Sequence, residues 1–196
     1  VGRRSKAAVV VRGKGSELHC MNTRMRNSED SGLLVEEAGQ AVLKGCRADG
    51  CGWEGWEVED RGSSFAAHDS TSCGNCFGNA SISFGATAHF VRCTLDNSQS
   101  YGLHACSSNV SADATSFIGN EGTNVLAKKG SAVKLNGCRM NESKDFGVTA
   151  EHKGTTIIAD FTCEAEGNAL GKFLESKGGR VIATWPRAPS RKCCIS

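Results

Sequence analysis

Residues 130–138 read GSAVKLNGC, and in this stretch apolar and polar residues alternate between two glycines. Residues 154–161, GTTIIADF, repeat the pattern 24 residues further along the chain. Alternation over four to eight residues, bounded by Gly, Asn, Asp or Ser, is typical of a β-strand. No segment keeps a helical period for long, so the sequence predicts a chain of short strands.

The glycine that opens these stretches recurs at steps of 22 to 24 residues. The marks are Gly15, Gly39, Gly62, Gly85, Ser108 in place of glycine, Gly130, Gly154 and Gly178. The residues three positions after each mark are apolar in all but one case, and they are Leu18, Val42, Phe65, Ala88, Ser111, Val133, Ile157 and Val181. A second frame, Cys-x-x-Asp/Asn-x5-Gly, begins at Cys46, Cys93 and Cys138. Two independent frames in register indicate a repeat protein.

A unit of this length is too short for a helix pair of roughly 34 residues, and it lacks the Leu and Asn frame of leucine-rich repeats. It fits one turn made of three short strands, and turns stacked about 4.8 Å apart place like residues on one another. We therefore predict an all-β chain, a single-stranded right-handed parallel β-helix (solenoid) of about eight coils over residues 7–184. Residues 1–6 form a basic N-terminal segment and residues 185–196 a basic C-terminal tail.

The periodic glycine, the Cys-x-x-Asp/Asn-x5-Gly frame and the strand pattern resemble the right-handed β-helix repeats of pectate-lyase-like proteins. That group includes carbohydrate-binding and sugar-hydrolase proteins and the β-helix region of some F-box proteins. The resemblance covers roughly residues 7–184 and implies a fold without specifying an activity. In pectate-lyase-like enzymes, acidic groups on such a face bind calcium while an Arg or Lys abstracts a proton. The Asp-Asp and Gly-His-Gly signatures of polygalacturonases are absent from this sequence.

Composition excludes several classes of protein. The chain has 24 Gly but only 2 Pro among 196 residues, which argues against collagen, proline-rich disorder and a helical bundle. Lys and Arg number 23 against 21 Asp and Glu, so we expect no nucleic-acid partner. The 11 Cys are spread along the chain, which favours small apolar filler in an intracellular reducing compartment over a disulfide framework. The chain begins with Val1, so we expect a processed form or a fragment.

An acidic cluster is expected where Glu36-Glu37 and Glu59-Asp60 lie one coil apart. Mutual repulsion of four carboxylates favours a bound cation, a basic partner or raised pKa values. Calcium is one alternative because it binds hard oxygen ligands, and Arg12 lies one coil earlier as a candidate base. The other alternative is a solvated or partner-binding face. We predict no cofactor and assign no catalytic residue.

The strongest candidate for a ligand-binding site is a bend of the chain beside this cluster. Trp53 and Trp56 bracket a bend at Gly55, next to Glu57 and Glu59. Such side chains could stack on a sugar ring or anchor a protein interface. The predicted binding residues are therefore Trp53, Trp56, Glu36, Glu37, Glu59 and Asp60.

Other cysteines and histidines suggest weaker sites. Cys73 and Cys76 form a C-x-x-C pair that, with Cys51 and His68, could ligate zinc; the alternatives are a redox pair or simple loop thiols. The interior filler set is predicted to be Cys20, Cys46, Cys93 and Cys138, with Ser70 and Thr115 taking the same place in the coils between. The remaining candidates, His19, His89 and Lys134, share one column but lie three and two coils apart, so we expect single surface side chains.

The last four residues, from Cys193 to Ser196, fit the C-a-a-X prenylation pattern, and Ser at the last place favours farnesyl. Basic residues just upstream supply a second signal, which predicts peripheral membrane attachment through the C-terminus. The alternative is an ordinary tail, with Trp185 capping the last coil.

These features favour a non-catalytic β-helix scaffold that presents strand faces to a protein partner, with a glycan as another ligand, as a subunit of a larger assembly. The alternative is a polysaccharide lyase or glycoside hydrolase that uses the acidic cluster. Carboxylates that face one another in a groove lined by Trp53 and Trp56 would support the enzyme. A flat apolar face would support the scaffold.

Overall fold

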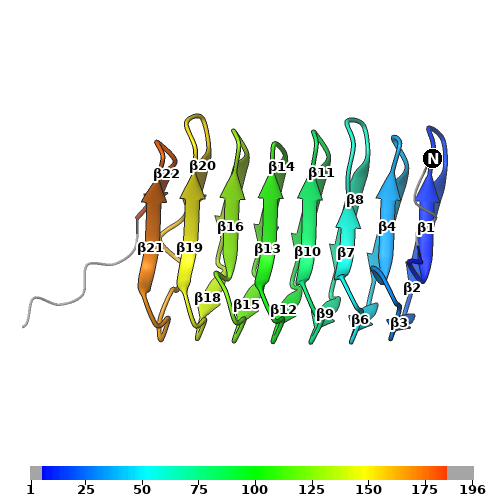
Figure 1. Cartoon of the computed structure of the whole chain (residues 1–196), viewed down its shortest axis with the longest axis horizontal. Helices are drawn as coiled ribbons and strands as arrows, with labels where there is room; N and C mark the ends of the chain where they lie inside the picture. The colour runs from blue at the N-terminus through cyan, green and yellow to red at the C-terminus, as the bar shows by residue number, and fades with distance from the viewer. Residues whose placement is uncertain (1–5, 185–196) are drawn as a thin grey trace, which may run out of the picture.

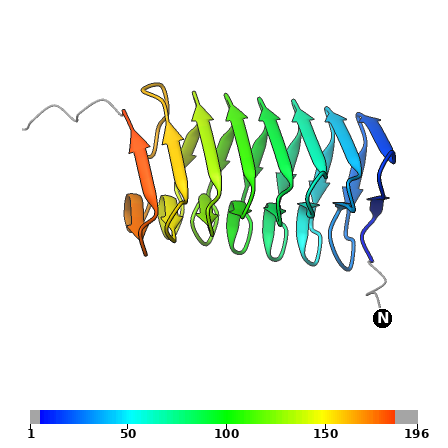
Figure 2. The ribbon, with the colours of Figure 1, turned by 90° about the horizontal axis from the view of Figure 1, so that it is seen from above.

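The computed structural model describes residues 6–184, which form 22 β-strands in three parallel sheets. Each strand pairs with its counterparts one coil before and one coil after, so the chain winds into a parallel β-helix of eight coils. Figures 1 and 2 show the coils stacked along one axis. None of the described residues belongs to a helix that could cross a membrane. The predicted fold class is confirmed.

Each sheet collects one strand per coil. The first sheet contains β1 (Val9–Arg12), β4 (Leu33–Glu36), β7 (Glu54–Val58), β10 (Gly78–Ser83), β13 (Tyr101–Cys106), β16 (Val125–Lys128), β19 (Phe146–Glu151) and β21 (Gly171–Ser176). The second contains β2 (Glu17–Met21), β5 (Gln40–Lys44), β8 (Ser64–His68), β11 (Thr87–Val91), β14 (Asn109–Asp113), β17 (Ala132–Asn136), β20 (Thr156–Ala159) and β22 (Arg180–Ala183). The third contains β3 (Arg24–Arg26), β6 (Arg47–Asp49), β9 (Thr71–Cys73), β12 (Thr94–Asp96), β15 (Ser116–Ile118) and β18 (Arg139–Asn141).

The glycine marks lie at the turn between the first and second sheets, where Gly62 has a φ of +94°, in the left-handed region that favours glycine. In two coils this place is instead taken by Ala38 and Ser107, with φ of 66° and 54°, one residue before the predicted mark. The inward column therefore contains Ala41 and Val110, which pair in register with Phe65 and Ala88.

The set of residues three positions after each mark, read as one column, is wrong at Val42 and Ser111 for this reason. Val42 pairs with Ala66 on the outer face of the second sheet, and Ser111 pairs with His89 there. With the shift corrected, the inward column is apolar in every coil: Leu18, Ala41, Phe65, Ala88, Val110, Val133, Ile157 and Val181. A continuous interior of stacked apolar side chains results, as the repeat predicted.

A column of thiols and hydroxyls lines the bend before the third sheet. Cys46, Cys93 and Cys138 are at most 2% exposed, and Ser70 and Thr115 occupy the coils between them. The Ser70 hydroxyl donates to the carbonyl of His68 at 2.7 Å, and the neighbouring thiols donate to the carbonyl two residues back in the same way. The predicted stacking of thiol on hydroxyl is confirmed.

Cys20 does not belong to this column. It pairs in register with Leu43 on the second sheet and so joins a different set of inward side chains. Its inclusion with the bend cysteines was therefore wrong.

The last glycine of the Cys-x-x-Asp/Asn-x5-Gly frame has a packing role. A Cβ atom on Gly55 would lie 1.9 Å from the Ser72 hydroxyl and 2.7 Å from the Asn75 amide nitrogen, both of them buried. Gly55 therefore faces the interior. Trp56, the next residue, is also fully buried. Two consecutive inward positions break the strand alternation at the start of β7 and leave Glu54 on the outer face, whereas Glu57 lies there by ordinary alternation between Trp56 and Val58.

Candidate functional site

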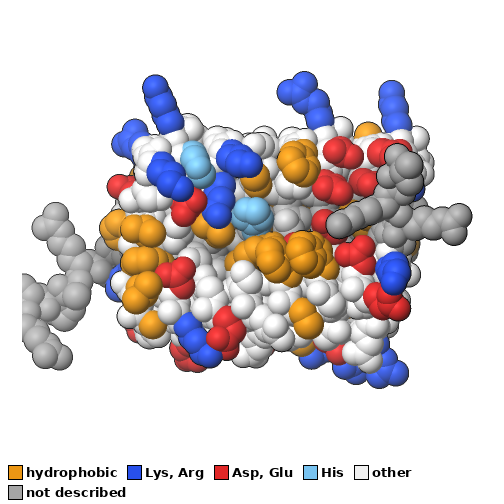
Figure 3. Space-filling model, in the orientation of Figure 1, with side chains coloured by type: hydrophobic (Ala, Val, Ile, Leu, Met, Phe, Trp, Pro, Cys, Tyr) orange, Lys and Arg blue, Asp and Glu red, His pale blue; other side chains and the backbone are white. Residues whose placement is uncertain are grey.

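A groove of about 370 Å³ crosses the outer face of the first sheet near its N-terminal end. It is lined by Arg12, Asp30, Leu34, Glu36, Trp53, Glu57 and Glu59. In Figure 3, hydrophobic side chains run across the middle of this face, acidic side chains gather at the N-terminal end, and a group of basic side chains lies toward the C-terminal end. The groove thus combines an aromatic residue with a set of carboxyl groups.

Strand β7 positions Glu57 in this groove. Its register partners on either side are Leu34 and Ser81, both of them buried residues of the first sheet. The Ser31 hydroxyl donates to Glu57 Oε2 at 2.6 Å. Burial raises the pKa of Glu57 to about 7, with further contributions from the nearby carboxylates of Glu59, Asp30 and Glu36. A carboxyl group with this pKa carries a proton for much of the time at neutral pH.

Glu54 is the second unusual carboxyl group of β7. It is 2% exposed, and its Oε1 accepts a hydrogen bond from the Tyr101 hydroxyl at 2.8 Å. Its Oε2 has no hydrogen-bond partner among the described residues. Burial raises the pKa of Glu54 to about 8, and the charge of Glu57 raises it further. The pair is consequently disfavoured in the doubly ionised state.

Aromatic rings extend the groove along the face. Trp53 and Phe77 stack with their ring planes parallel and their centroids 4.3 Å apart, and both remain partly exposed, at 42% and 38%. Tyr101 meets Phe77 edge to face at 5.5 Å, and its ring lies 4.9 Å from that of His104. The exposed stack offers a flat apolar platform beside the carboxyl groups.

His104 differs from the acidic groups in that its neutral form is favoured. Burial lowers the pKa of His104 to about 4, and the positive charges of Lys128 and Lys129 lower it further. Its Nε2 has no hydrogen-bond partner among the described residues. This histidine is therefore an uncharged ring at neutral pH.

The positive charge in the groove is already paired. Arg12 Nε donates to Glu36 Oε1 at 2.7 Å, and a second nitrogen of the same guanidinium also contacts that oxygen. Arg12 also lies 3.8 Å from a carboxylate oxygen of Glu37. Asp30, Glu57 and Glu59 have no such partner within residues 6–184, so the groove is acidic overall.

The structure brings together only part of the predicted binding set. Trp53, Glu36 and Glu59 line the groove, whereas Glu37 and Asp60 lie in the turn beyond it, with φ of 53° and 74°. Trp56 is fully buried, with its ring 5.5 Å from that of Phe65, and cannot reach a ligand. The expectation that both tryptophans flank this binding site was wrong, because Trp56 lies on the inward side of β7 with Val58.

Three residues of this site were not predicted from the sequence, namely Glu54, Tyr101 and Asp30. Strict alternation places Glu54 on the same side as Trp56, and Tyr101 lies two coils away in the chain. Asp30 precedes β4 at the place that Trp53 occupies one coil later, as the hydrogen bond from the Trp53 amide to the Asp30 carbonyl shows. The one feature of the sequence that could have indicated Glu54 was Gly55, the last residue of the Cys-x-x-Asp/Asn-x5-Gly frame. Because Gly55 points inward, Glu54 lies on the outer face.

The predicted zinc ligands do not form a site. Among the described residues, no group of three or more His, Cys, Asp or Glu side chains could hold a metal ion. Cys51 is buried, Cys76 is exposed, and the Cys73 thiol accepts a hydrogen bond from Arg47 at 2.6 Å. The acidic cluster likewise shows no arrangement for calcium in residues 6–184. Trp185 and the C-a-a-X cysteine, Cys193, lie outside the described residues.

No protein-family model matches this chain, and no curated protein sequence does either. Among solved structures, the chain is similar to the A-module of the mannuronan C-5 epimerase AlgE4 from Azotobacter vinelandii, with 9% sequence identity and a TM-score of 0.39. The match covers 80% of this chain and 61% of that one, so the chain spans less than two thirds of that module. The likeness is one of β-helix fold alone.

Proposed function

We propose that the chain binds an uncharged glycan in the first-sheet groove and hydrolyses its glycosidic bonds. The observation that carries this proposal is Glu57, a groove carboxyl group whose pKa of about 7 lets it hold a proton at neutral pH beside the exposed ring of Trp53. Perturbed carboxyl groups in a cleft are characteristic of catalytic sites. This function corresponds to the sugar-hydrolase alternative of the sequence interpretation.

Glycoside hydrolysis needs one protonated and one ionised carboxyl group. Glu57 donates its proton to the leaving glycosidic oxygen. The carboxylate of Glu59 accepts a proton from a water molecule, whose oxygen bonds to the anomeric carbon as the glycosidic bond breaks. Glu57 and Glu59 both line the groove, and the charge of Glu59 is close enough to contribute to the raised pKa of Glu57.

The charge of the groove selects the substrate class. Glu36 and Glu59 lie in it with Asp30, and Arg12, the one cation that lines it among residues 6–184, is bound to Glu36. A polyuronate would be repelled by these carboxylates, whereas a neutral sugar ring can stack on Trp53 and Phe77. We therefore propose a neutral polysaccharide as the ligand.

The second candidate is the non-catalytic binding module, and the short connections around the groove favour it. Only five residues link Val58, the end of β7, to Ser64, the start of β8. Catalytic sites commonly draw on longer loops that close over the substrate. In this alternative, Trp53 and Phe77 anchor a protein or glycan partner and no bond is broken.

The test is incubation of the whole chain with neutral polysaccharides (xylan, mannan, mixed-linkage glucan) and with polyuronates, followed by measurement of reducing ends and of retention in affinity gels. We expect cleavage of a neutral polymer, and Glu57→Gln should lower the rate by at least about 100-fold while retention persists. Glu164→Gln, an exposed carboxyl group paired with Arg139, is the matched control. Retention without cleavage supports the binding module. The absence of both retention and cleavage contradicts the hydrolase and the glycan-binding form of the module.

A further inference from the structure

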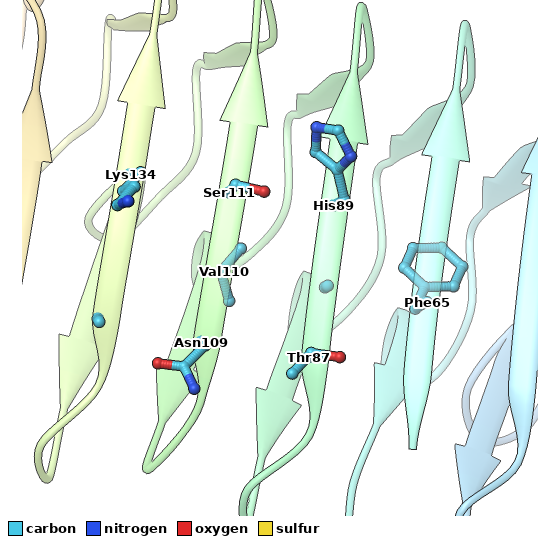
Figure 4. A pocket seen from close by; sticks show the side chains of 9 residues that line it. Phe65, Thr87, His89, Asn109, Val110, Ser111 and Lys134 are labelled. Atoms are coloured by element: carbon cyan, nitrogen blue, oxygen red, sulfur yellow. The ribbon is translucent and has the colours of Figure 1, made fainter. Parts of the chain in front are cut away.

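A second hollow, of about 510 Å³, lies on the second sheet, where it crosses strands β8, β11, β14 and β17. Figure 4 shows the side chains that line it. Phe65, Ala88 and Val110 take part, but their side chains are buried, so the strands themselves form the floor. The outward side chains of the hollow are Thr87, His89, Asn109, Ser111, Ala132 and Lys134.

Three of these side chains form one row across the sheet. His89 pairs in register with Ser111, and Ser111 pairs with Lys134. The small Ser111 side chain thus lies between two larger nitrogen-bearing side chains, whose strands are about 9.6 Å apart. The sequence analysis placed His89 and Lys134 in one column two coils apart. Ser111 fell outside that column because the mark at Ser108 lies one residue after the turn position, Ser107.

His89 is held in position by a carboxylate. Its Nε2 lies 2.7 Å from Asp113 Oδ2, and the Asn136 amide donates to the other oxygen of Asp113 at 2.7 Å. The hydrogen bonds from Asn136 and His89 lower the pKa of Asp113, so this carboxyl group is ionised at neutral pH. Its charge is therefore directed to His89 and Asn136, and the row itself contains no acidic side chain.

Lys134 faces the hollow without a counter-charge. No ion pair joins it to another residue between 6 and 184, and its neighbours across the sheet are Ser111 and Ile158. Within the same range, the Thr87, Asn109 and Ser111 side chains form no hydrogen bond to protein groups. Within the described part of the chain, the hollow thus has one cation without an ion pair, one oriented imidazole and three polar groups that can meet sugar hydroxyls.

We propose that this hollow binds a small polyhydroxylated anion of monosaccharide size, whose carboxylate or phosphate group contacts Lys134. The volume lies within the range of small-molecule sites, and charge complementarity selects an anion. The second-sheet hollow and the first-sheet groove lie on different faces and attract opposite charges. The inference therefore stands independently of the hydrolase proposal.

The experiment is isothermal titration of the whole chain with D-glucuronate, glucose 6-phosphate and glucose. We expect at least one of the two anions to bind at least tenfold more tightly than glucose, and the tighter of the two identifies the anionic group. Lys134→Met should weaken that binding at least tenfold, because it removes the charge and keeps the apolar stem. Lys44→Met, on β5 of the same sheet but outside the hollow, should leave affinity unchanged.

A melting curve for each variant confirms that the exposed substitution leaves the fold intact. Equal binding of glucose and the anions, no binding of any of the three at millimolar concentration, or an unchanged affinity in Lys134→Met would each overturn the proposal.

Discussion

The first and second sheets share one coil repeat, but their strands alternate differently. Strands β8, β11 and β14 of the second sheet alternate strictly, with the second and fourth residues buried and the others partly or fully exposed. Strand β7 of the first sheet instead buries both Gly55 and Trp56. The charged groups differ accordingly: Glu54 and Glu57 of the first sheet are buried or partly buried and have no counter-ion among residues 6–184, whereas His89 and Asp113 of the second sheet are partly exposed and contact one another.

The difference between the two sheets shows where a regular β-helix can hold carboxyl groups with raised pKa values. A carboxyl group on a strictly alternating strand faces water and is not raised in pKa by burial; the pKa of Asp113 on β14 is instead lowered by hydrogen bonds from Asn136 and His89. On β7, the inward Gly55 leaves Glu54 on the outer side but buried, and this burial raises the pKa of Glu54. The raised pKa of Glu54 is therefore a consequence of the packing around β7.

The largest effect is expected from Glu54→Gln, which tests the burial of charge on the first sheet. Burial raises the pKa of Glu54 from its ordinary value of 4.5 to about 8, so between these values the folded protein keeps a proton that the unfolded chain releases. Stability therefore falls as the pH rises through this window. Glutamine cannot ionise, and the variant should be more stable than the wild type at pH 9 by about 4 kcal/mol, with little difference at pH 4.

Denaturant unfolding of both proteins at several pH values measures this effect. Stability curves that run parallel from pH 4 to pH 9 would show that Glu54 is not perturbed. The contrast between the two sheets would then disappear.

The next effect is expected from Gly55→Ala, which tests the cause of the broken alternation. The new Cβ atom would lie 1.9 Å from the buried Ser72 hydroxyl and 2.7 Å from the Asn75 amide nitrogen, so these two side chains must shift. We expect a loss of about 2 to 3 kcal/mol in the free energy of unfolding.

Gly74→Ala is the matched control for this change. Gly74 has a φ of +61° and open space around it, so its substitution adds local backbone strain of about 1 kcal/mol without any clash. If the two variants lose the same stability, steric packing does not explain the inward position of Gly55.

The smallest effect is expected at the ion pair that follows strands β8 and β11 of the second sheet. Arg92 donates to both oxygens of Asp69 at 2.6 and 2.9 Å, but the two side chains are 60% and 43% exposed. Solvent screening leaves such a pair with little net stabilisation. Arg92→Ala should keep its melting temperature within about 2 °C of the wild type in a thermal scan, and a larger fall would show that the exposed pairs of the second sheet are not marginal.

The sequence was sufficient for the fold because the repeat is redundant. Glycine marks, alternation and the cysteine frame all give the same coil length, so an error of one residue at Ala38 or Ser107 does not alter the architecture. The site was harder to predict from the sequence, because it depends on which face of the sheet each residue of β7 occupies. Trp53, Glu36 and Glu59 line the groove, and Trp56 lies inside in phase with Val58, whereas Glu54 lies on the outer face only because Gly55 points inward. Tyr101 could be joined to Glu54 only in three dimensions.

The most direct test of the account is a carbon-13 NMR titration of the glutamate carboxyl groups in the intact chain, with Glu54→Gln and Glu57→Gln used to assign the signals. We predict that Glu54 and Glu57 titrate together with apparent pKa values near 7 and 8, well above those of the other glutamates. If both signals titrate with the rest at about 4 to 5, these carboxyl groups are solvated anions, and the proposed proton donor of the groove does not exist.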